Sequence, residues 1–388
     1  MFFHVSKTAQ NNFPYNHITE NFVISLDEGW HQTTDQHGNK IWYKGYLDQG
    51  RLADHAVEIG DQEEPKYSGN FCVIKVFDQG LILRTDKLRS FPIWYDAVQG
   101  LTNLRQLKET FWTDSYVMLA NDFSIIHSKY DAIGPIDDRA LSLDSVVTEI
   151  DRILDQKVQD FIVQQTQPIR IFLSGGVDTA LVYSYIQKHT NNYELVPYTH
   201  IDFDYFYLKN HYTLSQLWGY TQIHHWKEPC VLATGALGDE FTARSPVTAN
   251  LLLLHHRLSI PELLASDYGN CLHSEYYSNP EYHRLWAEQQ QNYLHKSLKD
   301  TIYECCHHNI NDWQHWHFGN TLTWTPLRDL SIFKLIARLP IDELKQQIMN
   351  SVIQRRLITK NNPEILTYLS TKKNSANSFE NLTNLYCK

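Results

Sequence analysis

The stretch from Ile169 to Leu181 constrains the fold of this chain more than any other. It begins with a short apolar run, Ile169–Leu173, which is typical of a buried parallel strand. Gly175 and Gly176 then permit a tight turn that leaves backbone N–H groups uncovered, and residues 180–188 are predicted to form a helix. A strand, a glycine-rich turn and a helix N-terminus together favour phosphate binding, because free N–H groups and the positive helix end face the anion.

Two hydroxyl groups and one carboxylate accompany this turn. Ser174 and Thr179 can donate hydrogen bonds to a phosphate, whereas Asp178 would repel a bare phosphate. We therefore expect a divalent cation between Asp178 and the phosphate. No Gly-Lys-Ser/Thr follows the glycines, so the turn is not a Walker loop. A strand-to-helix turn with coincidental glycines is the alternative interpretation.

The hexapeptide Ser174-Gly175-Gly176-Val177-Asp178-Thr179 resembles the pyrophosphate loop of the N-type ATP pyrophosphatases, usually written SGGxDS. Members of that family cleave ATP between the α- and β-phosphates, attach AMP to a carbonyl or carboxyl oxygen, and release pyrophosphate. The resemblance therefore implies ATP and Mg²⁺ as cofactors.

A second apolar run, followed by glycines and paired carboxylates, extends from Cys230 to Phe241. It resembles the L-S-G-x-G-x-D-E-x-F segment of asparagine synthetases. Asp239 and Glu240, together with Asp178, would form a hard-oxygen site suited to Mg²⁺. The alternative is a helix N-terminus where the dipole favours acidic residues. The family often has a glutamate between the two glycines, where this chain has Ala236.

Residues 195–201 predict another strand of the same sheet. Ligands of doubly wound sheets lie outside the carboxyl ends of the strands. In the resembled family this edge contacts adenine, which implies His200 and Ile201 here. The connection from His225 to Val231 is shorter than a parallel crossover usually needs, so the topology around residues 221–235 stays open.

The C-terminal part carries two further similarities. Residues 325–330 resemble the family's R-x-P-F-L-D motif, with Leu322 and Trp324 at the positions of its upstream glutamate and arginine. Residues 354–373 resemble its tail, whose last lysine contacts the adenylate or pyrophosphate. That resemblance implies this role for Lys372 or Lys373, and a solvated charge pair is the alternative.

The first part of the chain predicts mostly β-structure. Residues 71–77, a turn at 78–80 and residues 81–85 give a clear hairpin signal. Gly69-x-Phe71, Asp78, Arg84-x-Asp86 and Pro92-Ile93-Trp94-Tyr95 resemble a run found in class II glutamine amidotransferase domains. In asparagine synthetases that domain precedes the pyrophosphatase domain. An unrelated β-rich domain is the alternative.

Active class II domains use an N-terminal cysteine as the nucleophile. This chain has Met1-Phe2 at that place, and its first cysteine, Cys72, falls inside a predicted strand. We expect a domain that keeps the amidotransferase fold and lacks glutaminase activity. The β-lactam synthetases, which belong to the superfamily that the chain resembles, show the same loss.

An amphipathic helix at residues 142–165 follows, with a domain boundary expected between Ala132 and Leu143. The resemblances imply a degenerate glutamine amidotransferase-like domain over residues 1–137 and an asparagine-synthetase-like ATP pyrophosphatase domain over residues 138–388. The expected fold class is α/β and α+β. It combines an N-terminal Ntn-hydrolase-like β-rich domain with a C-terminal doubly wound parallel sheet (adenine nucleotide α-hydrolase-like) and a helical C-terminal part.

Composition limits the classes of function. The chain has 388 residues and a formal net charge of −10. A nucleic-acid footprint would need a basic face, so no nucleic-acid partner is expected. The six cysteines show no Cys-x-x-Cys spacing, which indicates neither a zinc site nor a disulfide framework. No signal peptide or membrane-spanning run is evident, so a soluble cytoplasmic protein without a membrane partner is expected.

Together the resemblances predict an asparagine-synthetase-like ligase that adenylates a carboxylate and transfers it to ammonia or an amine. The nitrogen would come from free ammonia, an amine or a separate glutaminase. The protein partner would be that glutaminase or a second copy of the chain in a homodimer. The implied ATP-binding residues are Leu173, Ser174, Gly175, Gly176, Val177, Asp178, Thr179, His200, Ile201, Thr234 and Gly235. Asp178, Asp239 and Glu240 would bind Mg²⁺, and Asp178, Asp239, Lys372 and Lys373 would be catalytic.

Two other functions are compatible with parts of the sequence. Deazaguanine nitrile or amide synthesis uses a similar loop, but those relatives carry a four-cysteine zinc cluster whose spacing is absent here. A catalytically silent nucleotide-binding or scaffold protein would explain the missing N-terminal cysteine and the apolar Ala236 and Leu322.

Overall fold

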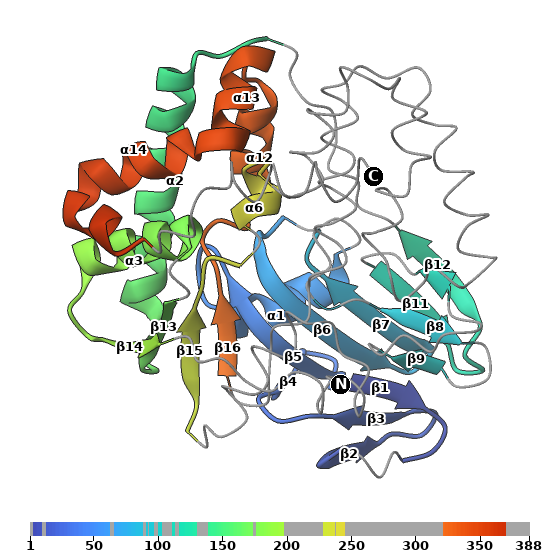
Figure 1. Cartoon of the computed structure of the whole chain (residues 1–388). Coiled ribbons are helices and arrows are strands. Elements are labelled where there is room, and N and C mark those ends of the chain that lie inside the picture. The colour runs from blue at the N-terminus through green and yellow to red at the C-terminus, as the bar shows by residue number, and fades with distance from the viewer. Residues whose placement is uncertain are drawn as a thin grey trace, which may run out of the picture.

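The computed structural model describes residues 3–9, 13–62, 66–87, 91, 93–96, 100–102, 111–112, 116–129, 139–173, 176–197, 228–236, 238–244 and 321–369. These residues form a mixed α/β fold with two antiparallel sheets and one parallel sheet (Figure 1). The antiparallel sheets come from residues 3–129, and the parallel sheet comes from residues 169–324.

The two antiparallel sheets face each other across an apolar core that includes Phe3, Ile24, Trp42, Ile74 and Leu83. The first sheet has the order β10-β8-β9-β1-β3-β2. Its strands are β1 (Phe3–Ser6), β2 (Tyr15–Ile18), β3 (Val23–Leu26), β8 (Trp94–Asp96), β9 (Gly100–Thr102) and β10 (Phe111–Trp112).

The second antiparallel sheet has the order β12-β11-β7-β6-β5-β4. Its strands are β4 (His31–Thr34), β5 (Lys40–Leu47), β6 (Gly69–Phe77), β7 (Gly80–Thr85), β11 (Tyr116–Ala120) and β12 (Ile125–Lys129). Helix α1 (Leu52–Asp61) covers the face turned away from the first sheet and packs Leu52 and Ile59 against Phe71 and Val73. The β6–β7 pairing confirms the hairpin predicted at residues 71–85.

The parallel sheet has the order β14-β13-β15-β16. Its strands are β13 (Ile169–Leu173), β14 (Tyr193–Pro197), β15 (Cys230–Ala233) and β16 (Thr321–Trp324), and every neighbouring pair runs parallel. Strands β14 and β15 lie on opposite sides of β13, so the chain crosses β13 between residues 197 and 230. The path of this crossover lies outside the described residues.

Helices pack with the parallel sheet into one apolar core, to which Ile150, Ile171, Tyr185, Phe333 and Leu357 contribute. They are α2 (Leu143–Gln164), α3 (Val177–His189), α12 (Leu330–Ala337), α13 (Ile341–Asn350) and α14 (Val352–Asn361). A short helix α6 (Gly238–Phe241) lies beside α12, and a 3₁₀ helix (Pro363–Tyr368) follows α14. The bounds of α2 confirm the amphipathic helix predicted at residues 142–165.

The antiparallel and parallel sheets are joined through α2 and the loop after β16. Tyr46 of β5 packs edge-on against Phe161 of α2, with ring centroids 5.8 Å apart. Lys157 of α2 lies 3.1 Å from both Asp48 and Asp329. The expected division at residues 137 and 138 lies outside the described residues. Among the described helices, none combines the length and apolarity needed to cross a membrane.

Candidate functional site

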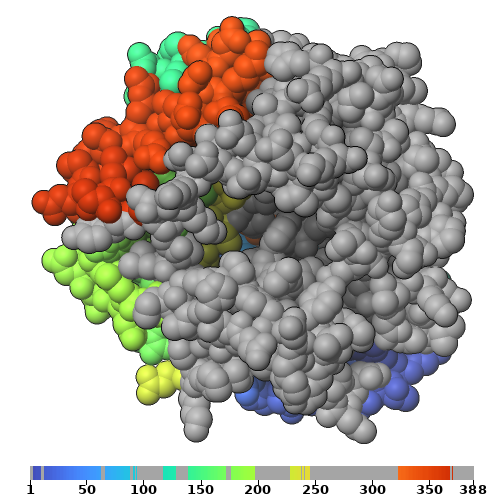
Figure 2. Space-filling view, in the orientation of Figure 1, coloured from blue at the N-terminus to red at the C-terminus, as the bar shows by residue number. Residues whose placement is uncertain are grey.

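The candidate site lies where the carboxyl ends of the parallel strands meet. The register pairs Ile171 with Ala233 and Ala233 with Trp324, so β13, β15 and β16 end at the same edge. Helix α3 begins at Val177, four residues after β13 ends, and its first turn carries Asp178. In the space-filling view, part of the segment 228–244 is visible within a hollow of the surface (Figure 2).

Two glycines allow the turn after β15 to lie directly against the start of α3. A Cβ atom on Gly235 would lie 2.5 Å from the carbonyl carbon of Asp178 and would overlap the backbone nitrogen of Thr179. A Cβ atom on Gly238 would lie 2.6 Å from the Asp178 Cγ atom. The structure thus brings together the two acidic segments that the sequence analysis singled out.

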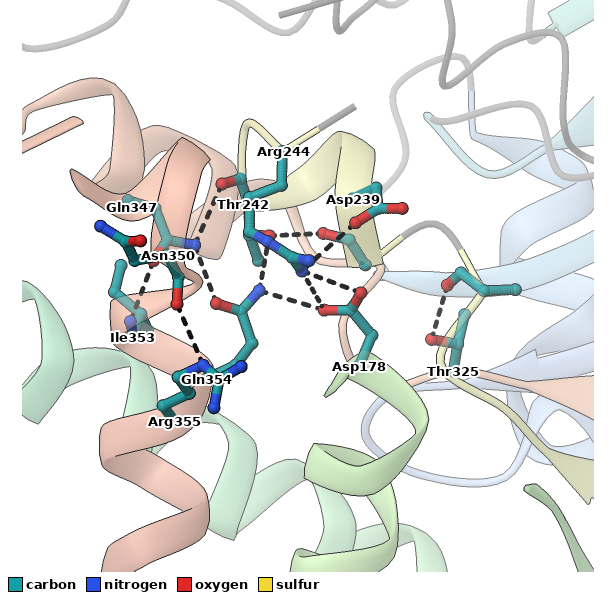
Figure 3. A network of polar contacts seen from close by, with 12 residues as sticks. Asp178, Asp239, Thr242, Arg244, Thr325, Gln347, Asn350, Ile353, Gln354 and Arg355 are labelled. Atoms are coloured by element: carbon teal, nitrogen blue, oxygen red, sulfur yellow. Dashed lines mark hydrogen bonds and ion pairs between the residues drawn. The ribbon is translucent and has the colours of Figure 1, made fainter. Parts of the chain in front are cut away.

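An arginine joins the two carboxylates at this contact (Figure 3). The Arg244 Nη1 atom lies 2.9 Å from both Asp178 carboxylate oxygens and 3.2 Å from Asp239 Oδ1. The side chains of Arg244 and Asp178 are each 13% exposed, whereas that of Asp239 is 46% exposed. Asp178 therefore lies inside the site, and Asp239 lies on its solvent side.

The backbone after α6 returns Arg244 toward these carboxylates. Thr242 N donates to Gly238 O at 3.0 Å, and Arg244 N donates to Asp239 O at 2.6 Å. Between them, Ala243 is buried with φ +56°, a left-handed conformation. That conformation costs a residue with a Cβ about 1–2 kcal/mol. The tight turn that it makes directs Arg244 back toward α6.

Buried amides from the C-terminal helices complete the network around Asp178 (Figure 3). Gln354 Nε2 donates to Asp178 Oδ1 at 3.0 Å and to Thr242 Oγ1 at 2.7 Å. Gln347 Nε2 in turn donates to Gln354 Oε1 at 2.8 Å. Both glutamine side chains belong to residues with no exposed surface. Such a fully connected buried network fixes the Asp178 carboxylate in one orientation.

The electrostatics of the carboxylate pair follow from this geometry. The pKa of Asp239 is raised to about 7. Burial is the largest cause, the Arg244 guanidinium opposes it, and the Asp178 charge adds to it. Solvent reaches the half-exposed Asp239 side chain and screens part of this effect. The direction is that expected of two carboxylates that share one site.

The donor set fits a divalent cation. Oxygens of Asp178 and Asp239 converge on one nitrogen atom, so both can approach a single cation that takes its place. Mg²⁺ is commonly bound by one or two carboxylates together with substrate phosphates. Within the described residues, no group of three or more His, Cys, Asp or Glu side chains could hold a metal. Asp178 and Asp239 are therefore the candidate ligands, and the Glu240 side chain lies outside the described residues.

The structure places the other predicted nucleotide-binding residues as follows. Leu173 ends β13, Gly176 precedes α3 as its N-cap, and Val177 and Thr179 lie in the first turn of that helix. Thr234 follows β15, and its Oγ1 atom accepts a hydrogen bond from Ala236 N at 2.8 Å. Ser174, Gly175, His200, Ile201, Lys372 and Lys373 lie outside the described residues.

The loop after β16 supports the glycine turn. Thr325 Oγ1 donates to Ala236 O at 3.0 Å, and Thr234 N donates to Trp324 O at 3.0 Å. Trp324 is buried and stacks on Phe161 with ring centroids 3.9 Å apart. The tryptophan at the position of the family's arginine is therefore a core residue here.

Arg244, Gln347 and Gln354 are site residues that the sequence analysis missed. Arg244 lies 66 residues after Asp178, and Gln354 lies 176 residues after it. A local signal existed only for Arg244, because it lies four residues after the end of the Gly-Asp-Glu segment. The residue type alone gave no such signal for the two glutamines, because Gln346, the neighbour of Gln347 on α13, is exposed.

The first cysteine of the chain, Cys72, is poorly suited to act as a nucleophile. Cys72 is buried in β6, as its predicted strand position implied. Burial raises the pKa of its thiol well above the usual value, and the Asp86 charge raises it further. Since the thiolate is the reactive form, this cysteine is a structural residue.

Comparisons with known proteins give little further guidance. No protein-family model matches the chain, and no curated protein matches it either. Among solved structures, the chain is similar to a glutamine phosphoribosylpyrophosphate (PRPP) amidotransferase from B. subtilis complexed with ADP and GMP. The TM-score is 0.18 and the identity 9%, over 56% of this chain and 60% of that one. The matched part is therefore less than two thirds of that structure, and a likeness this weak assigns the chain to no family.

Proposed function

We propose that the chain is an ATP-dependent carbon–nitrogen ligase that forms AMP and pyrophosphate and resembles the asparagine synthetases. One observation carries this proposal: two acidic segments distant in sequence meet beside a helix N-terminus at the carboxyl edge of a parallel sheet. That edge is where nucleotides bind in open α/β sheets. The substrates would be a small carboxylate and an amine or ammonia.

The chain's own residues supply the following roles in this proposal. The turn before α3 and the first N–H groups of that helix would face the phosphates. Asp178 and Asp239 would hold Mg²⁺, which neutralises the charge that develops on the leaving pyrophosphate. Gln354 keeps the Asp178 carboxylate in place through its hydrogen bond. Lys372 or Lys373 would contact the adenylate.

The same proposal includes the finer description of the fold. Residues 138–388 would form the pyrophosphatase domain, with a doubly wound sheet of the adenine nucleotide α-hydrolase kind. Residues 1–137 would form an Ntn-hydrolase-like domain without glutaminase chemistry, which is consistent with the burial of Cys72. Nitrogen would then reach the site as ammonia or as an amine.

The products of ATP cleavage test this proposal. ATP labelled at the α-phosphate, incubated with Mg²⁺ and a panel of carboxylates and amines, should yield labelled AMP. Asp239→Asn is nearly isosteric and should lower pyrophosphate release about 100-fold, the scale for removing one preorganised charge-stabilising group. The control is Asp342→Asn, because the Asp342 side chain is 90% exposed and pairs with the exposed Lys345 on the same helix. Labelled ADP as the main product would contradict the proposal.

A catalytically silent nucleotide-binding protein is the second candidate. Arg244 favours it, because its guanidinium already occupies the position between the two carboxylates. Calorimetric titration separates the candidates, since a silent protein would bind MgATP without releasing pyrophosphate for any member of the panel.

A further inference from the structure

The position of Arg244 raises a question about the metal site. Its Nη1 atom makes three short contacts with two carboxylates, at 2.9, 2.9 and 3.2 Å. These oxygens are the same ones that would coordinate a cation. A guanidinium and a divalent cation cannot both lie between them, because they would need the same oxygen lone pairs and would repel each other.

Burial and local backbone geometry keep Arg244 in this position when no metal is bound. Asp178 and Arg244 are each 13% exposed, and burying the Asp178 carboxylate beside a second carboxylate without a cation is unfavourable. The left-handed Ala243 and the hydrogen bond from Arg244 N to Asp239 O direct the side chain back over α6. Arg244 thus compensates the charge that the pair would otherwise leave uncompensated.

We propose that Arg244 is an internal substitute for the divalent cation, which it keeps out of the Asp178–Asp239 site until metal and nucleotide arrive together. A free cation must displace the guanidinium and gains only the two carboxylates. A metal–nucleotide complex also brings phosphate oxygens, and the displaced guanidinium can form paired hydrogen bonds with them. Arg244 is therefore a selectivity residue, and this inference rests on the proposed nucleotide site.

The energetic consequence is a coupling between metal and nucleotide. In the wild-type chain, nucleotide should raise metal affinity, because it provides a new partner for the arginine. By linkage, metal should raise nucleotide affinity by the same factor. Without the guanidinium, the carboxylates are open to a free cation, and much of the coupling should disappear.

Binding of Mn²⁺ alone to the full-length chain tests the inference. Electron paramagnetic resonance counts free Mn²⁺ directly, so it measures metal affinity without any enzymatic activity. Arg244→Gln should bind Mn²⁺ at least ten times more tightly than the wild type. Arg244→Lys keeps a cation and should stay close to the wild type. Arg152→Gln removes an equal charge at an exposed position of α2 and should also leave the affinity unchanged.

A double variant separates a change in Mn²⁺ affinity from a loss of folding. Arg244→Gln leaves two carboxylates facing each other and can weaken the fold, which circular dichroism would reveal. Asp178→Asn combined with Arg244→Gln removes both charges, so it should remain folded and lose the gain in Mn²⁺ affinity. Equal Mn²⁺ affinity of folded Arg244→Gln and wild type would overturn the inference, as would a gain that survives in the double variant.

A second titration includes ATP. Nucleotide should increase Mn²⁺ affinity more in the wild type than in Arg244→Gln, and an equal increase in both would overturn the selectivity role. Failure of every variant to bind ATP would contradict the proposed function. The Mn²⁺ measurement without nucleotide would still decide whether Arg244 substitutes for a cation, so the two failures can be told apart.

Discussion

Single residues decide how closely the acidic turn can approach α3. Gly235 and Gly238 lie where even a methyl group would collide with Asp178 or Thr179. Both collisions involve backbone or the first side-chain carbons of a helix, which cannot move without displacing α3. The two glycines are therefore required by close approach, and φ > 0 plays no part in the requirement.

Replacing either glycine by alanine should separate the turn from α3. We expect Gly235→Ala and Gly238→Ala each to lower the free energy of unfolding by about 1–3 kcal/mol, the range for overpacking a tight contact. Gly60→Ala in helix α1 is the matched control. A Cβ atom at that position would lie at ordinary contact distance, 3.4–3.6 Å, from the side chains of Lys75 and Val73. That control should be neutral or stabilising. Urea unfolding measures all three, and equal stability of the site variants and the wild type would contradict the geometry.

The Cys72 thiol should be unreactive in the folded chain. It has no exposed surface, and burial raises its pKa, so both access and thiolate formation are suppressed. Alkylation with a thiol reagent, read by peptide mass spectrometry, should modify Cys72 only after denaturation. Glutamine hydrolysis that disappears in Cys72→Ser would show instead that this cysteine is a nucleophile.

At the scale of elements, α13 and α14 act as a support for α3. Their junction is Ser351, which has φ +53° and lets α14 begin directly where α13 ends. Gln347 Oε1 accepts a hydrogen bond from Ile353 N at 2.9 Å, so one side chain bridges the two helices. Through Gln354 the pair then reaches the Asp178 carboxylate. The orientation of a helix N-terminus thus depends on helices that follow it by more than 150 residues.

Gln354→Leu tests this support. The change removes the amide that serves Asp178 and Thr242 and leaves the Gln347 donor with a poorer partner. We expect a loss of about 1–3 kcal/mol in the free energy of unfolding, the range for unsatisfied buried polar groups. Gln346→Leu, at an exposed position of α13, is the matched control and should stay within about 0.5 kcal/mol of the wild type. Similar stabilities of the two variants in urea would argue against the network.

At the scale of the whole molecule, buried charges connect the antiparallel sheets to the parallel sheet. Lys157 of α2 is 6% exposed and contacts Asp48 after β5 and Asp329 at the start of α12. Burial lowers the pKa of Lys157, but the charges of Asp48 and Asp329 outweigh it and leave that pKa above its usual value. Arg328 and Asp86 form a second buried pair, 3.2 Å apart, across the same interface. The loop that carries Arg328 and Asp329 also carries Thr325, so the interface and the glycine turn share one segment.

Lys157→Met should weaken the whole molecule. It leaves Asp48 and Asp329 close together and largely buried without their shared cation, a change that typically costs about 3–5 kcal/mol. Lys345→Met is the control, since Lys345 is 41% exposed and pairs with an exposed aspartate. Urea unfolding followed by tryptophan fluorescence should show the loss for Lys157→Met alone. An unchanged midpoint would mean that this cluster does not stabilise the interface.

The elements were predictable from the sequence where the signal is local. The apolar run at 169–173 followed by two glycines predicts β13 and its turn, and the structure gives β13 those bounds. The β6–β7 hairpin and helix α2 were likewise predictable, since alternation, turn residues and apolar spacing identify them. The start of the next parallel strand was predicted wrongly. Strand β14 is Tyr193–Pro197, whereas the strand predicted at residues 195–201 began two residues later. Strand pairing with β13 decides where β14 begins, and such pairing is invisible in a single segment.

The sequence by itself determined the two acidic segments and the glycines that let them meet. Each depends on neighbours within a few residues, so apolar runs, glycines and carboxylates suffice to recognise them. Only the tertiary structure decided that Arg244 lies between Asp178 and Asp239 and that Gln354 holds Asp178 in place. It alone also brought Lys157 to Asp48. The contacts of Asp178 with Arg244 and Gln354 join residues 66 and 176 positions apart, and their energies depend on burial. Burial is a property of the packed molecule, and no short stretch of chain records it.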